Sequence, residues 1–178
     1  LREAAVEAFG KIDILINCAG RTQRRPTLEV DEAEWQGILD VNLTGTLRAC
    51  QVFGAHMLEL GYGRIVNIAS LASFVGLYEV AAYAASKAAV AALTRALAVE
   101  WGPRGVLVNA IAPGVFRTPL NQDLLDGTGR GHEFKLRTPL ARFGRVEELA
   151  GAAVFLAGPD STYVTGQCYG VNGGAVMT

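Results

Sequence analysis

The residues best suited to acid–base chemistry lie in the stretch AAYAASKAAV, residues 81–90. Tyr83 and Lys87 are four positions apart, so on a helix they share one face, one turn from each other. A phenol with its ordinary pKa near 10 is a weak catalyst at neutral pH, but an adjacent ammonium favours the phenolate and lowers that pKa. The pair therefore predicts a tyrosine that gives a proton to a carbonyl oxygen, or takes one from an alcohol, as hydride moves at the adjacent carbon.

The elements that position this pair can be predicted from two alternating hydrophobic patterns. Short β-branched runs predict strands over residues 12–17, 64–69, 106–112 and, more weakly, 168–172. Alanine- and leucine-rich segments with helical spacing predict helices over residues 1–9, 32–59, 81–101 and 147–157. Glycines suited to C-caps stand at the helix ends, at Gly10, Gly61, Gly102 and Gly158. Because the strands are apolar on both faces, we expect an open α/β parallel sheet with helices on each side.

The composition indicates one globular domain over residues 1–178, with 51% hydrophobic residues to build its core. A formal net charge of −1, from charges scattered along the chain, gives no general attraction to nucleic acid or anionic membrane. No apolar run approaches the roughly 18 residues of a membrane span, and no basic-then-apolar leader opens the chain. We therefore expect a cytoplasmic protein without nucleic-acid or membrane partners.

The cysteines and histidines form no metal or redox motif. Cys18, Cys50 and Cys168 are widely spaced within apolar segments, so we expect three reduced, buried thiols. Neither His56 nor His132 accompanies a serine or a metal-ligand set, and we assign neither a role. We expect no bound metal.

Small and polar residues follow the predicted strands, at the edge where open α/β sheets bind their ligands. After the three strongest strands they are Asn17, Cys18, Ala19 and Gly20, then Ser70, then Pro113, Gly114 and Thr118. Taken singly, each is an ordinary turn former or helix cap. However, the helix of Tyr83 and Lys87 follows directly on the strand that ends in Ser70, so we expect these three side chains to converge.

Five motifs in order along the chain resemble the classical short-chain dehydrogenases/reductases. They are NCAG (17–20), NLTG (42–45), a serine thirteen residues before Tyr83, YAASK (83–87) and NAIAPGVFRT (109–118). The resemblance implies a doubly wound, Rossmann-like sheet. It also implies an NAD- or NADP-dependent oxidoreductase that interconverts a secondary alcohol and a ketone on a small-molecule substrate.

The resemblance also implies roles for individual residues. Tyr83 is the acid/base, Lys87 lowers its pKa and bonds the nicotinamide ribose, and Ser70 holds the substrate oxygen. Asn42 holds a water that connects Lys87 to solvent. The residues implied to contact the cofactor are Asn17, Ala19 and Gly20 on the adenosine side, Pro113 and Gly114 beneath the nicotinamide, and the Phe116 backbone and Thr118 near its carboxamide.

Two departures from the family pattern matter. Cys18 stands where the family's motif has a second asparagine. The family also begins with a strand, a glycine-rich T-G-x-x-x-G-x-G loop and a helix that holds the pyrophosphate, and these have no counterpart here. GTGRG (127–131) has the glycines but no strand before it. We therefore expect the C-terminal portion of a dinucleotide-binding domain, with the choice between NAD and NADP left open.

The loops predict the substrate. RTQRRP (21–26) directly follows NCAG, and the segment 115–146 carries six basic residues against three acidic ones. Such a rim suits an anion, and we expect Arg24 and Arg25 to grip a carboxylate. Together with K-x-R-T-P-x-A-R-F-G (135–144), this loop is similar to gluconate 5-dehydrogenase and related keto-sugar-acid reductases, which implies gluconate or 5-ketogluconate as substrate.

Two alternative functions stay open, and the helices also predict an oligomeric state. A 3-oxoacyl-carrier-protein reductase would use the basic surface to dock an acidic carrier, and a chain without the glycine-rich loop could be a non-catalytic pseudo-enzyme or assembly subunit. The helices over 32–59 and 81–101 are apolar over more surface than one sheet face covers, and in the resembling family they pair with their copies across a two-fold axis. We therefore expect a homodimer or homotetramer.

Overall fold

A computed structural model describes residues 1–119 and 121–176. Four strands form one parallel sheet, in the spatial order β1 (Ile14–Asn17), β2 (Gly63–Ile68), β3 (Val106–Pro113) and β4 (Cys168–Val171). Strand order in space therefore equals strand order in sequence, and each connection crosses over to the next position. The predicted parallel α/β sheet is confirmed.

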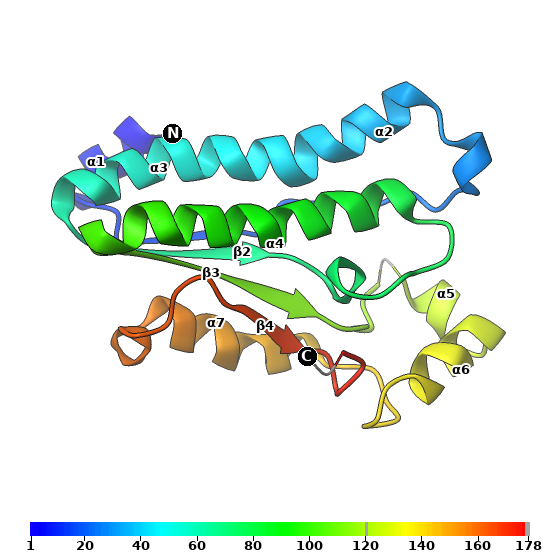
Figure 1. Ribbon diagram of the computed structural model, residues 1–178. Coiled ribbons are helices and arrows are strands. Elements are labelled where there is room, and N and C mark those ends of the chain that lie inside the picture. Colours follow the sequence, from blue (N-terminus) through cyan, green and yellow to red (C-terminus); the bar gives the residue numbers. More distant parts are fainter. Residues whose placement is uncertain (120, 177–178) are drawn as a thin grey trace.

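Helices occupy the segments between the strands (Figure 1). The α-helices are α1 (Arg2–Phe9), α2 (Glu32–Leu39), α3 (Gly45–Leu60), α4 (Ala81–Trp101), α5 (Gln122–Leu125), α6 (Gly129–Leu136) and α7 (Ala150–Ala157). Short 3-10 turns are η1 (Thr27–Glu29), η3 (Leu71–Ser73), η4 (Gly102–Arg104), η5 (Val146–Leu149) and η6 (Pro159–Ser161). The single helix predicted over 32–59 is instead α2 and α3 joined by one π-helical stretch, η2 (Asp40–Thr44).

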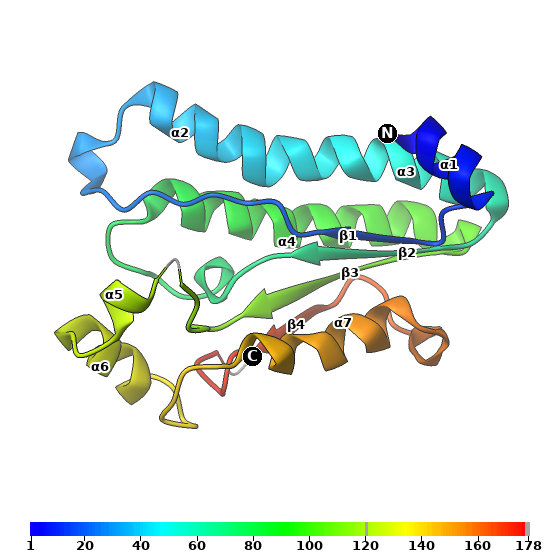
Figure 2. The same cartoon turned by 180° about the vertical axis from the view of Figure 1, so that it is seen from behind.

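Helices α3 and α4 cover one face of the sheet and α7 covers the other, as both views show (Figures 1 and 2). The alternation of side chains along β2 explains this arrangement. Ile65 packs toward α3 and α4 in a core with Met57 and Val108, whereas Val66 packs toward Leu156 of α7. Both faces of the central strands are therefore buried, which is why their sequence is continuously apolar.

At the end of the sheet where the strands begin, Gly61 and Gly105 allow the chain to turn and to pack closely. Gly61 ends α3 in the left-handed conformation (φ 67°), as expected of a C-cap. Gly102 takes the C-cap position of α4 but keeps helical dihedrals (φ −53°), and the chain makes one more turn before Gly105 adopts φ 82°. A Cβ on Gly105 would stand 2.1 Å from the Gly61 carbonyl oxygen, so only glycine fits there.

The strands point toward the end of the molecule that carries α5 and α6 (Figure 1). This end holds the polar residues that follow β1, β2 and β3. Within the described part of the chain, no helix is both long enough and apolar enough to cross a bilayer.

Candidate active site

A buried amide network fixes the ends of β1 and β2 relative to α4. The Asn17 amide donates to the Asn67 side-chain oxygen at 2.8 Å, and Asn67 donates to the Thr94 hydroxyl at 3.0 Å. Thr94 in turn donates to the Val90 carbonyl at 2.9 Å. The Asn17 side chain, expected to line the adenosine side of a cofactor, is thus engaged within the protein, and its predicted role stays a prediction.

The structure brings Ser70, Tyr83 and Lys87 together at the end of β2. Ser70 follows the strand, is 6% exposed, and its Oγ accepts the Ala72 backbone N–H at 3.1 Å. The Lys87 ammonium, on α4, is 4% exposed and donates to the Ile68 carbonyl at 2.6 Å. Its Nζ lies 5.9 Å from the centre of the Tyr83 ring. The end of β2 and one face of α4 therefore meet at these three residues, as their spacing in the sequence predicts.

The pKa values at this site are set by burial. Burial raises the pKa of the Tyr83 phenol above its usual 10.0, and a hydrogen bond with Ser70 opposes this only in part. Burial also lowers the pKa of Lys87, which the nearby Cys18 thiol opposes. We expected Lys87 to lower the pKa of Tyr83. In the structure the pKa of Tyr83 is raised instead, because desolvation of the phenol is the largest effect.

Asn42 lies in the π-helical stretch and clamps three segments together. It is fully buried; its Oδ1 accepts the Arg21 N–H at 2.7 Å, and its Nδ2 donates to the Arg21 carbonyl and the Ser86 hydroxyl, both at 2.9 Å. Both amide hydrogens are therefore used by the protein, and the expected water relay through Asn42 stays a prediction.

Ser86 is the site residue that sequence reasoning left without a role. It is fully buried, accepts from Asn42 and donates to the Tyr83 carbonyl at 2.7 Å. Its hydroxyl therefore ties the π-helical stretch to the turn of α4 that carries Tyr83. The signal was present in the sequence, because a serine interrupts an otherwise alanine-rich helix.

The residues around Lys87 fit a nicotinamide ribose. Among the described residues, only the Ile68 carbonyl accepts a bond from the ammonium, which leaves two N–H donors at a buried position, enough for a pair of neighbouring hydroxyls. A Cβ on Gly20 would stand 3.4 Å from both the Lys87 Nζ and the Asn42 Oδ1, which is ordinary contact distance. The Ala19–Gly20 turn thus lies directly against the ammonium.

The turn after β3 is held tightly from behind. A Cβ on Gly114 would stand 2.6 Å from the Asn172 Cα, and the Gly114 N–H donates to Val171 at 2.9 Å. Asn121 accepts the Thr118 N–H and donates to the Phe116 carbonyl, both at 2.8 Å. The segment from Pro113 to Thr118 is therefore preorganised, which suits a surface for a flat ring.

The arginines predicted to grip a substrate carboxylate are ion-paired in the structure. Arg24 Nε lies 2.5 Å from Glu79 Oε2, and Arg25 Nε lies 2.9 Å from Glu34 Oε2. Along 115–146, further pairs join Arg117 to Asp126, Arg137 to Glu133, and Arg142 and Arg145 to Glu148. The basic rim is therefore substantially neutralised, and substrate binding by Arg24 and Arg25 stays a prediction.

Two adjoining cavities lie between α6 and the loop after β2. Leu77, Phe134 and Arg137 line both of them. The smaller cavity, of about 240 Å³, is also lined by Leu71 and Val115. The larger cavity, of about 510 Å³, is also lined by Tyr78 of the loop after β2 and by Arg130 of α6. The smaller cavity reaches Leu71, the residue after Ser70, whereas Ser70, Tyr83 and Lys87 themselves line neither cavity.

Only one of the three cysteines is fully buried as expected, because Cys18 is exposed and Cys168 is half-buried. Cys50 is buried, and burial raises the pKa of its thiol to about 11. Cys18 is exposed instead of buried, because the turn after β1 carries it past the end of the sheet. Among residues 1–119 and 121–176, no three histidine, cysteine or acidic side chains gather as metal ligands.

Comparison with known proteins shows what the chain resembles. A family model described as enoyl-(acyl carrier protein) reductase matches residues 1–176. The 2-dehydro-3-deoxy-D-gluconate 5-dehydrogenase of Bacillus subtilis is 43% identical over 176 residues, which are 98% of this chain and 69% of that protein. The 3-oxoacyl-[acyl-carrier-protein] reductase FabG of Thermotoga maritima is 39% identical over 176 residues, 98% of this chain and 70% of that protein.

A solved structure agrees closely in fold. The crystal structure of a gluconate 5-dehydrogenase from Burkholderia cenocepacia, in complex with NADP and tartrate, superposes with a TM-score of 0.94 at 38% identity. The match covers 98% of this chain and 68% of that one. The chain spans about two thirds of the length of the curated relatives it matches.

Proposed function

The chain belongs to the short-chain dehydrogenase/reductase family, and on this premise we propose that the protein interconverts a secondary alcohol and a ketone on a sugar acid such as gluconate or 5-ketogluconate. The observation that carries the proposal is the convergence of Ser70, Tyr83 and Lys87 at one strand end, with two ammonium donors left for a ribose. NAD or NADP supplies or accepts the hydride when bound. The relatives named for sugar-acid chemistry support the substrate class.

Tyr83 and Ser70 would both act on the substrate oxygen, Tyr83 as the proton donor and Ser70 as a hydrogen-bond donor. Because burial raises the pKa of Tyr83, its phenol keeps its proton at neutral pH and can give it to the oxygen of a ketone. Ser70 accepts the Ala72 N–H and is hydrogen-bonded to the Tyr83 phenol, so its hydroxyl would turn its hydrogen from the phenol to the same substrate oxygen when a ketone binds. The ketone is thus polarised by one donor and protonated by the other.

Lys87 and the turns on either side of it orient the cofactor. Its ammonium carries a positive charge 5.9 Å from the phenol ring, which favours the phenolate that remains after proton transfer. Its two remaining N–H groups would hold the ribose, and the Ala19–Gly20 and Pro113–Thr118 segments would lie against the rest of the cofactor. Asn42 would hold the water that connects Lys87 to solvent for proton relay.

The proposal extends to assembly and location. The chain acts as one domain over residues 1–178, as part of a cytoplasmic homodimer or homotetramer. Exposed apolar side chains on the helical face support self-association: Val41 is 37% exposed, Val52 45% and Val99 78%.

A specific observation favours a second candidate, 3-oxoacyl-carrier-protein reduction. On α6, the Arg130 guanidinium lies 5.3 Å from the Phe134 ring centre and the Lys135 ammonium 4.8 Å from that of Phe143, so each packs on a ring. Neither has a carboxylate partner among the described residues, and an acidic carrier could use both. The relationship to FabG supports this alternative.

One panel of assays separates the candidates. The full-length protein is offered 5-ketogluconate, a neutral ketose and an acetoacetyl thioester, each with NADH and with NADPH. Turnover of the sugar acid supports the proposal, and turnover of the thioester alone favours the carrier reductase. Absence of turnover on all three, together with binding of NADPH, would favour the pseudo-enzyme.

A further inference from the structure

Glu79 has a backbone conformation that its side chain disfavours. Its φ is +64°, and Ala141 is the only other non-glycine residue with a positive φ in the described part of the chain. A Cβ makes this left-handed region costly, so neighbouring contacts must hold it. The Arg25 N–H donates to the Glu79 carbonyl at 2.8 Å, and the Arg130 side chain donates to the preceding Tyr78 carbonyl at 3.1 Å.

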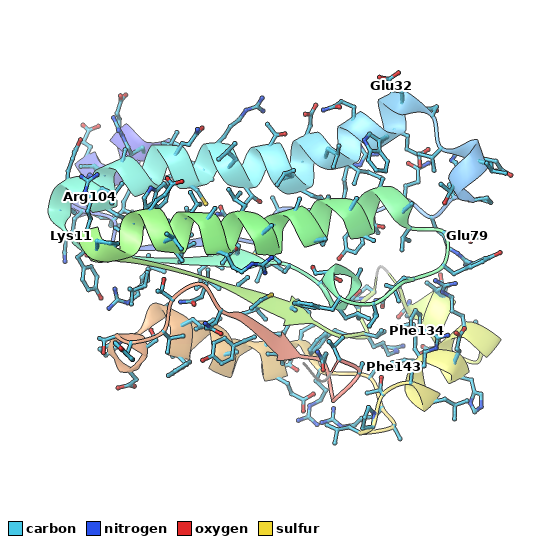
Figure 3. The ribbon with its side chains drawn as sticks, in the orientation of Figure 1. Lys11, Glu32, Glu79, Arg104, Phe134 and Phe143 are labelled. Atoms are coloured by element: carbon cyan, nitrogen blue, oxygen red, sulfur yellow. The ribbon has the colours of Figure 1, made fainter. Side chains whose placement is uncertain are left out.

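The strained residue adjoins the larger cavity, because Glu79 directly follows Tyr78, which lines that cavity. Glu79 precedes Tyr83 by four positions, in the loop that leads into α4. Figure 3 places it at the same end of the molecule as Phe134, which lines both cavities, and at the opposite end from Lys11 and Arg104. The strained backbone therefore holds Glu79 beside the wall of the larger cavity.

The partner of this carboxylate is Arg24. The shortest contact of this pair joins Arg24 Nε to Glu79 Oε2 at 2.5 Å, and among the described residues no hydrogen bond uses either Nη group. The Glu79 side chain is 20% exposed and the Arg24 side chain 45%, so the guanidinium keeps an open side. A planar guanidinium with two free Nη groups can still receive a second carboxylate in a bidentate manner.

We infer that Glu79 sets the affinity of the site for anionic substrates by neutralising Arg24. The inference rests on the proposed function, in which Arg24 receives the carboxylate of a sugar acid. That carboxylate would approach an arginine whose charge is already balanced, and it would meet the negative charge of Glu79. A neutral ketose would meet neither effect, so Glu79 lowers the preference for anions without touching the reacting atoms.

The expected effect follows from Coulomb's law. Two carboxylates held on opposite sides of one guanidinium are about 6 Å apart, and an effective dielectric constant of about 40, between those of a protein surface and water, gives about a ten-fold change in binding. Glu79→Gln should therefore lower KM for 5-ketogluconate about ten-fold. For a neutral ketose such as fructose, KM and kcat should stay within about two-fold.

The experiment uses the full-length protein and two control variants. Asp13→Asn removes a carboxylate from the ion pair with Lys11, at the opposite end of the molecule from Glu79, and it should leave KM for both substrates unchanged. Glu79→Gly removes the same charge as Glu79→Gln and also the Cβ strain, so it should fold even if the glutamine variant does not. Both Glu79 variants should lower KM for 5-ketogluconate and leave KM for fructose unchanged.

A binding readout separates this inference from the proposed function. The dissociation constant of D-gluconate is measured on the NADPH-loaded protein, which cannot oxidise it, so no turnover is required. About ten-fold tighter binding to the Glu79 variants supports the inference, even if the wild type reduces no sugar acid and the proposed function fails. Unchanged or undetectable gluconate binding, an equal shift for fructose, or an effect of Glu79→Gly alone would overturn it.

Discussion

The hydroxyl of Ser86 offers the sharpest test of how the site is held together. Ser86→Ala removes the acceptor of one Asn42 amide hydrogen and the donor to the Tyr83 carbonyl. Both Ser86 and Asn42 are fully buried, so the freed Asn42 N–H has no access to water. The Tyr83 carbonyl can keep its helical bond within α4, so the unpaired amide hydrogen dominates the cost.

The magnitude follows from that single orphaned donor. Leaving a buried N–H unpaired costs about 1–3 kcal/mol, and each kcal/mol shifts the unfolding temperature of a chain of this size class by about 2–4 °C. We therefore expect the NADPH-bound Ser86→Ala protein to unfold about 2–12 °C below the wild type. Thermal unfolding followed by circular dichroism at one fixed protein concentration measures the shift, because assembly makes it concentration-dependent.

Ser73 provides a matched control. Its Oγ is buried and has no hydrogen-bond partner among the described residues, so Ser73→Ala removes a hydroxyl that makes no bond. This variant should unfold within about 1 °C of the wild type or slightly above it. If Ser86→Ala and Ser73→Ala shift the unfolding temperature equally, the clamp formed by Asn42 and Ser86 does not stabilise the site.

Three further predictions address chemistry, substrate and pH. Tyr83→Phe should lower kcat about 100- to 10,000-fold while NADPH affinity stays within about three-fold, and near-normal turnover would refute the role of the phenol. Replacing Arg24 and Arg25 together by alanine should raise KM for 5-ketogluconate about ten- to a hundred-fold and spare fructose, since a charge-assisted bond contributes about 1.5–3 kcal/mol; equal losses on both would make the arginines structural. The pKa of Cys50 is raised from 9.0 to about 11, so the folded state holds this proton more tightly than the unfolded chain. Its contribution to stability is therefore complete below pH 9 and is lost as the pH rises toward 11, and iodoacetamide at pH 8 should label Cys18 but not Cys50, as mass spectrometry would show.

The parts of the site that could be predicted are those fixed by backbone periodicity. Apolar runs located the strands, and a strand followed directly by a helix requires Ser70 to approach the first turns of that helix. The four-residue spacing of Tyr83 and Lys87 then placed both on the face that meets the strand end. No long-range side-chain information was needed for any of these steps.

The parts that could not be predicted depend on partners distant in sequence or on burial. Arg24 and Arg25 read as free cations because Glu79 and Glu34 lie in other segments, and only the folded loops bring each pair together. The direction of the Tyr83 pKa depends on how completely α4 and the loop after β2 exclude water, which residue spacing does not encode. The π-helical stretch covers only the five residues Asp40–Thr44, so it shifts the hydrophobic spacing by one residue at a single turn. A shift over so short a segment is too small a signal to separate from ordinary helical spacing.

The spatial order of the strands has a consequence for synthesis on the ribosome. Because β1, β2, β3 and β4 stand side by side in the order in which they are made, each new strand emerges when its pairing partner is already complete. At elongation rates of about 5–20 residues per second, the helix between two strands takes seconds to emerge, far longer than a helix needs to form. Once β1 has paired with β2, the described part of the sheet can therefore grow by one strand at a time, because β3 and β4 each add to a strand that is already made.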